Sequence, residues 1–329
     1  MFLHFIILLL LWEKTAYRKY DFNYLRRCPG YLTLAKYLKP ISLLLFIFFH
    51  SPVFAQEEEF SKEPSVVIYT GLINYQGDLN PNSFTIGHAN FATGISLRKP
   101  VNRWFTARAG ITIGQIEAAD RYNRDYLKPR NLSFFSNIKE AFAALEFTFL
   151  DINRSRFTPY VYAGIAVFHF NPWTYDNEGQ KVYLQPLSTE GEGIPQFPSQ
   201  KPYHLTQFSL PFGIGAKYAI SNNINIGFEF SQRKTFTDYL DDVSSFYVDK
   251  NVLLQARGPK AVELAYRGNE LPGGTGYPAH GEQRGTASEM DWYYFAGLNI
   301  EIKLSAFTDL FNGSRNNKSY QQRCPRKLL

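Results

Sequence analysis

The feature that most constrains the fold of this chain is a series of segments in which apolar and polar residues alternate. Successive side chains of a β-strand point to opposite faces, so this alternation predicts strands with one apolar and one polar face. Each segment has about the length of a tilted strand that crosses a membrane. Residues 65–74 and 158–171 are apolar on both faces in places. The eight segments are residues 65–74, 90–98, 105–114, 140–149, 158–171, 207–217, 224–233 and 292–303.

The connections between these segments alternate strictly between short and long. Outer-membrane barrels have short periplasmic turns and long external loops, whereas a soluble β-sandwich has no physical reason to alternate in this way. We therefore predict an all-β, eight-stranded antiparallel transmembrane barrel over residues 65–304, followed by a periplasmic tail at 305–329. The short connections are residues 100–103, 151–157 and 220–223, and the long ones are 75–87, 118–135, 171–204 and 236–290.

The composition agrees with a barrel and argues against two other classes. Aromatic residues make up 17% of the chain, with 22 Tyr and 29 Phe, and aromatic girdles at the membrane interfaces would use them. A mean hydropathy of -0.27 argues against a bundle of membrane-spanning helices. The net charge of +6 comes largely from basic residues near the two ends of the chain. A nucleic-acid partner, which requires a basic face on a folded domain, is therefore not expected.

Residues 1–55 read as a leader rather than as part of the fold. An apolar run at 41–49 follows Lys36 and precedes Val53 and Ala55, the pattern of a Sec-type signal peptide cleaved after Ala55. Gln56 follows the site, so a lipoprotein anchor, which needs Cys there, is not expected. Residues 56–64 would be a short linker, and the barrel would be inserted in the outer membrane, surrounded by its lipid.

The residues upstream of that signal are unusual. An over-extended gene start would explain residues 1–31, and a tandem pair of transmembrane helices is the less favoured alternative. Cys28 would be removed with the leader, which leaves Cys324 alone in the tail. No intramolecular disulfide is therefore expected.

The polar faces of the predicted strands carry nine charged side chains, five basic and four acidic. An eight-stranded barrel has room inside only for side chains or one small ligand. Unpaired buried charge is costly, so near-balance of sign predicts a plug of structural ion pairs rather than a permeation or catalytic site. The nine are Arg98, Arg108, Glu140, Glu146, Lys217, Glu229, Arg233, Glu301 and Lys303.

The most distinctive segment follows the seventh predicted strand. Its carboxylates Asp238, Asp241 and Asp242 could bind a hard cation, but their spacing matches no calcium loop and the turn glycine is missing. A loop anchored by caps and Asx-turns is the favoured interpretation. No cofactor or metal ligand set is expected, since the histidines lack metal-ligand spacing. The segment reads Thr235, Phe236, Thr237, Asp238, Tyr239, Leu240, Asp241 and Asp242.

Several short motifs together resemble a family of uncharacterised domains in Bacteroidota outer-membrane barrels, which includes the PorG component of the type IX secretion system. The resemblance covers about residues 65–325 and carries no catalytic residues. It implies an outer-membrane barrel whose periplasmic side contacts a ring lipoprotein of the translocon and that lipoprotein's partner. The motifs are residues 130–134 (RNLSF), 157–164 (FTPYVYAG), 186–191 (PLSTEG), 235–244 (TFTDYLDDVS), 291–293 (DWY) and Cys324-Pro325.

The sequence thus favours a non-enzymatic barrel that anchors or assembles a protein-secretion machine through its turns and tail, with no small-molecule substrate. A stand-alone surface-binding or adhesin-type barrel acting through its long external loops is the first alternative. Deletion within residues 251–285 would distinguish these two functions, because it should abolish the activity of an adhesin, whereas an anchor should tolerate much of the loss. The second alternative is a lipid-modifying enzyme of the outer membrane, in which His169 or His204 would need a nearby Ser and an acid.

Overall fold

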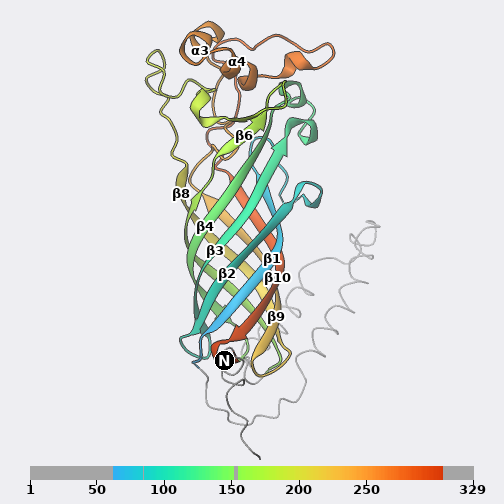
Figure 1. Cartoon of the computed structure of the whole chain (residues 1–329), viewed down its shortest axis with the longest axis vertical. Coiled ribbons are helices and arrows are strands. Elements are labelled where there is room, and N and C mark those ends of the chain that lie inside the picture. Colours follow the sequence, from blue (N-terminus) through green and yellow to red (C-terminus); the bar gives the residue numbers. More distant parts are fainter. Residues whose placement is uncertain (1–61, 84, 152–154, 307–329) are drawn as a thin grey trace, which may run out of the picture. The chain divides into compact units, whose positions relative to one another are not determined.

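The computed structural model describes residues 62–83, 85–151 and 155–306 (Figure 1). The predicted leader, its cleavage site after Ala55 and nearly all of the predicted tail lie outside the described residues. Eight long strands form the barrel wall. They are β1 (Ser65–Gln76), β2 (Asn90–Pro100), β3 (Phe105–Ala119), β4 (Ser133–Thr148), β5 (Phe157–His169), β8 (Thr206–Ala219), β9 (Ile224–Thr235) and β10 (Trp292–Lys303).

Every neighbouring pair of these strands is antiparallel, and the sheet closes on itself. The order β3-β2-β1-β10-β9-β8-β5-β4 is completed by a pairing between β3 and β4. In the register, Ser65 of β1 lies beside Lys303 of β10, and Phe105 of β3 lies beside Phe147 of β4. The predicted fold class, a closed eight-stranded antiparallel barrel, is confirmed.

The outer surface of the barrel is apolar on every strand. Each of the eight strands carries an aliphatic or aromatic side chain that is at least 45% exposed on this surface. So large a continuous apolar band is unfavourable in water and is the surface that membrane barrels present to lipid. One such residue from each strand, in chain order, is Ile68, Ile95, Ile111, Leu145, Ile165, Ile214, Phe228 and Leu298.

The two ends of the barrel differ. Short turns join β2 to β3, β4 to β5 and β8 to β9 at the end where β1 begins, which we call the turn end. At the opposite end, the cap end, the long connections fold over the barrel (Figure 1). The cap contains helices α3 (Lys250–Arg257) and α4 (Pro259–Ala265) and single 3-10 turns η2 (Ile86–His88), η3 (Asp120–Tyr122), η4 (Lys128–Arg130), η5 (Gln185–Leu187) and η6 (Gly268–Glu270).

The cap end departs from the sequence prediction in three ways. The segment 171–204 was expected to be a loop, but it forms a hairpin of β6 (Pro172–Tyr175) and β7 (Lys181–Tyr183). β6 pairs with β4 beyond the end of β5, so the sheet has ten strands, of which eight close the barrel. β3 and β4 also run further than expected, which shortens the predicted loop 118–135. The predicted loop 236–290 contains α3 and α4. Asp249 caps α3 by accepting hydrogen bonds from the N–H groups of Asn251 and Val252.

No helix among the described residues is long and apolar enough to cross a membrane.

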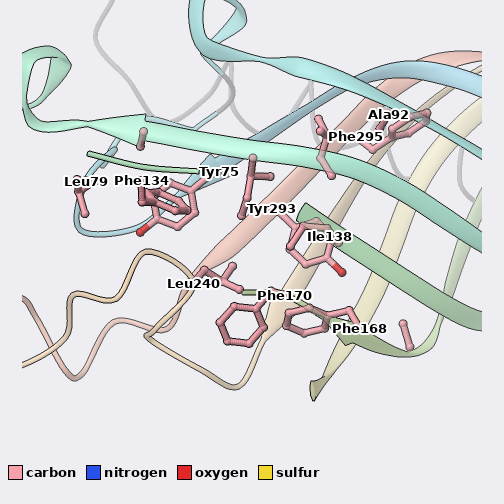
Figure 2. Close-up of a cluster of buried hydrophobic side chains, with 14 of the residues drawn as sticks. Tyr75, Leu79, Ala92, Phe134, Ile138, Phe168, Phe170, Leu240, Tyr293 and Phe295 are labelled. Atoms are coloured by element: carbon pink, nitrogen blue, oxygen red, sulfur yellow. The ribbon is translucent and has the colours of Figure 1, made fainter. Parts of the chain in front are cut away.

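A layer of buried apolar side chains fills the cap end of the barrel interior (Figure 2). Tyr75 packs edge-to-face on Phe134 with ring centroids 5.0 Å apart, and Phe168 packs in the same way on Tyr293 at 5.5 Å. Leu240, which is fully buried, comes down from the cap to join them. The cap and the barrel therefore share one hydrophobic core.

Inside the barrel, one aromatic ring lies over a glycine of the neighbouring strand. A Cβ added at Gly94 of β2 would lie 2.3 Å from the Tyr69 ring of β1, so the ring occupies the space that any larger residue would need. The Tyr69 hydroxyl is held beyond this point, 2.8 Å from the carbonyl oxygen of Ile111. Packing of this kind fixes the register of neighbouring strands.

Replacing Gly94 with Val should therefore destabilise the barrel by about 1–3 kcal/mol, because Tyr69 must leave its place over the backbone. The free energy of unfolding would be measured by urea titration in lipid vesicles. Ile95→Val, on the opposite, outward face of the same strand, is the matched control and should change stability little. Equal stability of the two variants would contradict the packing argument.

Candidate functional site

The barrel interior is closed by a network of buried ion pairs centred on Glu146. This carboxylate is fully buried, and three cations surround it. Lys217 Nζ lies 2.5 Å from Glu146 Oε1, while Arg98 Nε and Arg108 Nη1 lie 3.3 and 3.8 Å from Oε2. One carboxylate thus holds together cations from β2, β3 and β8. Removing it would leave three buried positive charges with too few partners.

Three further carboxylates complete the network. Glu229 Oε2 lies 2.9 Å from Arg108 Nη1, and Glu301 Oε2 lies 3.1 Å from Arg98 Nη1. Nearer the cap, Glu140 Oε2 lies 3.1 Å from Arg233 Nε. The structure therefore brings eight of the nine predicted charges into ion pairs, four acidic and four basic. Their formal charges cancel, as a buried set of this size requires.

Lys303, the ninth, does not belong to this set. It lies at the end of β10, is only half-buried, and forms no ion pair with a lumen carboxylate within the described ranges. The prediction placed it inside by strand alternation, but the strand ends there and the barrel interior opens to solvent. Without Lys303 the balance of the network is four to four rather than five to four.

Sequence reasoning missed the tyrosines that finish the network. Tyr160 and Tyr162 of β5 donate hydrogen bonds to Glu229 at 2.9 and 2.7 Å, and Tyr293 donates to Glu140 at 2.6 Å. They satisfy oxygen lone pairs that the arginines leave open. Their signal was present in the chain as tyrosine on the polar face of a predicted strand, where a phenol can reach a buried carboxylate.

Buried side chains occupy the barrel interior over the residues that the structure describes. The ion pairs run from the turn end up to Glu140 and Arg233, which lie level with Phe168 and Tyr293 in the register, and the apolar layer around Phe168 and Leu240 covers the cap side (Figure 2). An eight-stranded barrel has no further width to offer. Chemically, this interior is a plug that holds the strands together.

Substituting Glu146→Gln should destabilise the barrel strongly, by about 3–5 kcal/mol, because it removes the shared partner of three buried cations. The double variant Glu146→Gln with Lys217→Met restores neutrality and should recover much of that loss. The measurement is the free energy of unfolding in lipid vesicles. Glu117→Gln, on the same sheet but outside the network, serves as the control. No difference between Glu146→Gln and the control would refute the network's role.

The distinctive loop after β9 is tied to the start of β10. Thr235 donates a hydrogen bond from its hydroxyl to the carbonyl oxygen of Asp291 at 2.6 Å, and the Leu240 N–H donates to Asp291 Oδ2 at 2.8 Å. Asp241 Oδ1 accepts from the N–H of Val243 at 3.0 Å, which is an Asx-turn of the kind expected for this loop. Phe236 is exposed, whereas Leu240 is pinned in the barrel mouth. The loop closes the barrel.

The carboxylates of this loop lie in a buried acidic cluster rather than at the surface. The Tyr75 hydroxyl contacts Asp241 Oδ2 at 2.6 Å and Asp291 Oδ1 at 2.9 Å. A phenol has one proton and can donate it to only one of these oxygens. The other contact is favourable only if that carboxyl is protonated and donates to the phenol oxygen. Burial correspondingly raises the pKa values of Asp241 and Asp291 well above 3.8.

Asp242 and Glu190 lie beside a buried arginine, whereas the contacts of Asp241 and Asp291 require a proton. Arg284 Nη1 lies 2.9 Å from Glu190 Oε1 and also donates to the backbone carbonyl of Asp242. Thr189 and Tyr203 donate to the two carboxylate oxygens of Asp242, each at 2.6 Å. Glu190 and Asp291 were not singled out as site residues, although both lie in the short motifs that carried the family resemblance.

The cap should lose stability as the pH rises. Burial raises the pKa of Asp238 from 3.8 to about 9, of Glu192 from 4.5 to about 8 and of Asp242 from 3.8 to about 6. An unfolded cap would release these protons near pH 4, whereas the folded cap keeps them. The folded cap is therefore favoured most below about pH 4 and progressively less up to about pH 9.

Hydrogen exchange of α3 and α4 at about pH 6 and about pH 9, corrected for intrinsic rates, checks this direction. Protection should fall at the higher pH, and Asp238→Asn should weaken the dependence because its amide does not titrate. Asp125→Asn, at an exposed ion pair with Lys128, is the matched control and should behave as wild type. Protection that increases with pH would show the sign to be wrong.

Two chemical alternatives can be compared with the geometry. Among the described residues, no group of three or more His, Cys, Asp or Glu side chains is arranged to hold a metal ion. His169 Nδ1 lies 3.1 Å from Thr206 Oγ1 at an exposed position on the barrel wall. The alternative catalytic reading requires an acid and a Ser at this histidine, and Thr206 is the hydroxyl found there.

Fold and lumen together define a sealed eight-stranded barrel of the outer-membrane type. The chain belongs to a domain family of unknown function (DUF6089), whose model matches residues 39–253, or 215 of the 329 residues. No sequence among the curated proteins matches it significantly.

Several solved outer-membrane proteins resemble the chain weakly in structure. Neisserial surface protein A has 10% identity and a TM-score of 0.37, covering 75% of this chain and 100% of its own. Ail of Yersinia pestis, solved with a heparin analogue, has 9% identity and a TM-score of 0.33, covering 73% and 98%. OprG of Pseudomonas aeruginosa has 9% identity and a TM-score of 0.32, covering 74% and 97%. The barrel assignment depends on this chain's own strand pairing.

Proposed function

We propose that this protein is a non-conducting, non-enzymatic anchor in the outer membrane that helps to hold or assemble a protein-secretion machine. The observation that carries the proposal is the sealed lumen. Eight paired charges and an apolar layer fill the interior, which leaves the two ends as the surfaces of the barrel that face water. The motif resemblance to a family with a type IX secretion component supports the choice of machine, and it directs attention to the turn end.

The turn end has the chemistry of a docking surface. The exposed side chains Lys99, Arg103 and Arg156 surround the short turns, and Lys62 and Lys303 lie at the two ends of the barrel sequence. Only Glu63 and Asp151 oppose them within the described part of the turn end. An excess of exposed positive charge favours an acidic partner face and speeds its association. With the cap outside the cell, this surface faces the periplasm, where a ring lipoprotein and its partner would contact it.

Reversing the charge at Lys99, Arg103 and Arg156 to Glu should abolish co-purification of the periplasmic ring proteins and reduce secretion at least tenfold. The matched control reverses three exposed cap residues, Arg121, Lys128 and Lys201, and should leave both unchanged. Heat-modifiable migration of the barrel on gels would verify insertion of every variant. Normal secretion and co-purification by an inserted turn-end variant would overturn the proposal.

A further inference from the structure

The cap encloses an open cavity that plays no part in sealing the barrel. Its volume is about 670 Å³, within the range of about 300–1,000 Å³ that is usual for small-ligand sites. The lining comes from the end of β1 and the connection after it, from the segment after η3, and from several parts of the long loop between β9 and β10. These three segments are far apart in the sequence, so the cavity is a product of the folded cap.

The floor of the cavity is rigid and electrically satisfied. Arg130 Nη2 lies 2.6 Å from Asp120 Oδ1, and Arg284 Nη1 lies 2.9 Å from Glu190 Oε1, so both buried arginines already have carboxylate partners. Asp78 Oδ2 accepts the N–H of Thr286 at 2.9 Å. A preformed floor lowers the entropic cost of binding. It also offers no unpaired cation to a phosphate or sulfate group.

The walls combine aromatic rings with polar groups. Tyr247 and Tyr266 lie in the wall but are only 2% and 5% exposed, because they pack edge-to-face with centroids 5.9 Å apart and Tyr277, outside the lining, packs on both. At the rim, Tyr126 is 69% exposed, and Arg124 Nη1 donates to its hydroxyl at 3.2 Å. Amide and carboxylate side chains line the remainder of the cavity. These are Gln76, Glu282, Gln283 and Glu289.

The cavity has charged side chains of both signs in its lining. Three arginines and the carboxylates of Asp78, Glu282 and Glu289 line it, and two of these arginines are already paired with Asp120 and Glu190 behind the lining. The cavity is therefore polar and without excess positive charge, and Tyr126 supplies an exposed ring face at its rim. An anionic ligand would need an uncompensated cation, and a hydrocarbon would need an apolar lining. A peptide that adds a strand would need a long open edge, but β1 lacks a partner on its β2 side only over its last three residues, Asn74 to Gln76.

We propose that this cavity binds a neutral oligosaccharide. Sugar hydroxyls pair with planar amide and carboxylate groups, and the apolar C–H face of a sugar ring packs on an aromatic ring. Both kinds of group are present here on a rigid floor, at a size that suits a few sugar units. The site lies at the cap end and is independent of docking at the turn end. The sequence alone did not predict a ligand of this kind.

The test uses the full chain, purified in a detergent without a sugar headgroup, because a maltoside would compete for the cavity. The protein is applied to an array of neutral, sialylated and sulfated oligosaccharides and a set of peptides. Titration calorimetry with the strongest ligand then gives its Kd. The cell's own surface polysaccharide, released and titrated separately, distinguishes a ligand of the same cell from an external one.

We expect neutral oligosaccharides to bind and Tyr126→Ala to weaken that binding about tenfold, since it removes an exposed ring face. Glu289→Ala, a second rim change, should also weaken it. Tyr122→Ala, an exposed tyrosine of the same cap that lies outside the cavity, should bind as wild type. Binding only of charged oligosaccharides or peptides would overturn the proposal. Absence of binding, or binding that neither cavity variant weakens, would also overturn it.

Discussion

Pairing of buried charge inside the barrel is the constraint on which the other features depend. Six strands contribute the eight paired charges, and the remaining two reach the same network through hydroxyl groups. Ser65 of β1 donates to Glu301 at 2.5 Å, and Tyr160 of β5 donates to Glu229 at 2.9 Å. Every strand of the wall is therefore tied to the centre. Substituting one charged residue of this network without its partner would therefore disturb all eight strands. This interior suits a structural anchor better than a channel.

The cap controls its buried charge differently. Around the loop after β9, seven buried carboxyl groups face only two buried arginines, so ion pairing cannot neutralise them all. Protonation lowers the remaining charge, as the shared Tyr75 hydroxyl requires. In the lumen, arginine and lysine side chains neutralise the buried carboxylates. In the cap, some of the buried carboxyl groups are neutralised by protonation. The two halves of the molecule should accordingly respond to different solution conditions. The seven are Asp120, Glu190, Glu192, Asp238, Asp241, Asp242 and Asp291.

The sequence was informative where a simple period governs the structure. Alternation placed the eight wall strands and the side chains of their polar faces, because a strand has only two faces. Alternation failed at Lys303, which is the last residue of β10. A side chain at the end of a strand can be partly exposed to solvent even when it lies on the inward face. Alternation also failed in the segment 171–204, because β6 exists only where β4 outlasts β5 and offers a free edge. The buried partners Arg284 and Glu190 are 94 residues apart, and no local pattern brings them together.

The Tyr69 ring over Gly94 has a consequence for how the barrel assembles. A strand that slips by two residues keeps its faces correct, so hydrophobicity alone does not oppose the error. Such a slip would set the Tyr69 ring against Ala92 or Ser96, whose Cβ atoms occupy the space that Gly94 leaves empty. The ring thus fits its neighbour in one alignment. This one tyrosine–glycine pair therefore disfavours misaligned pairing of β1 and β2 during closure of the barrel.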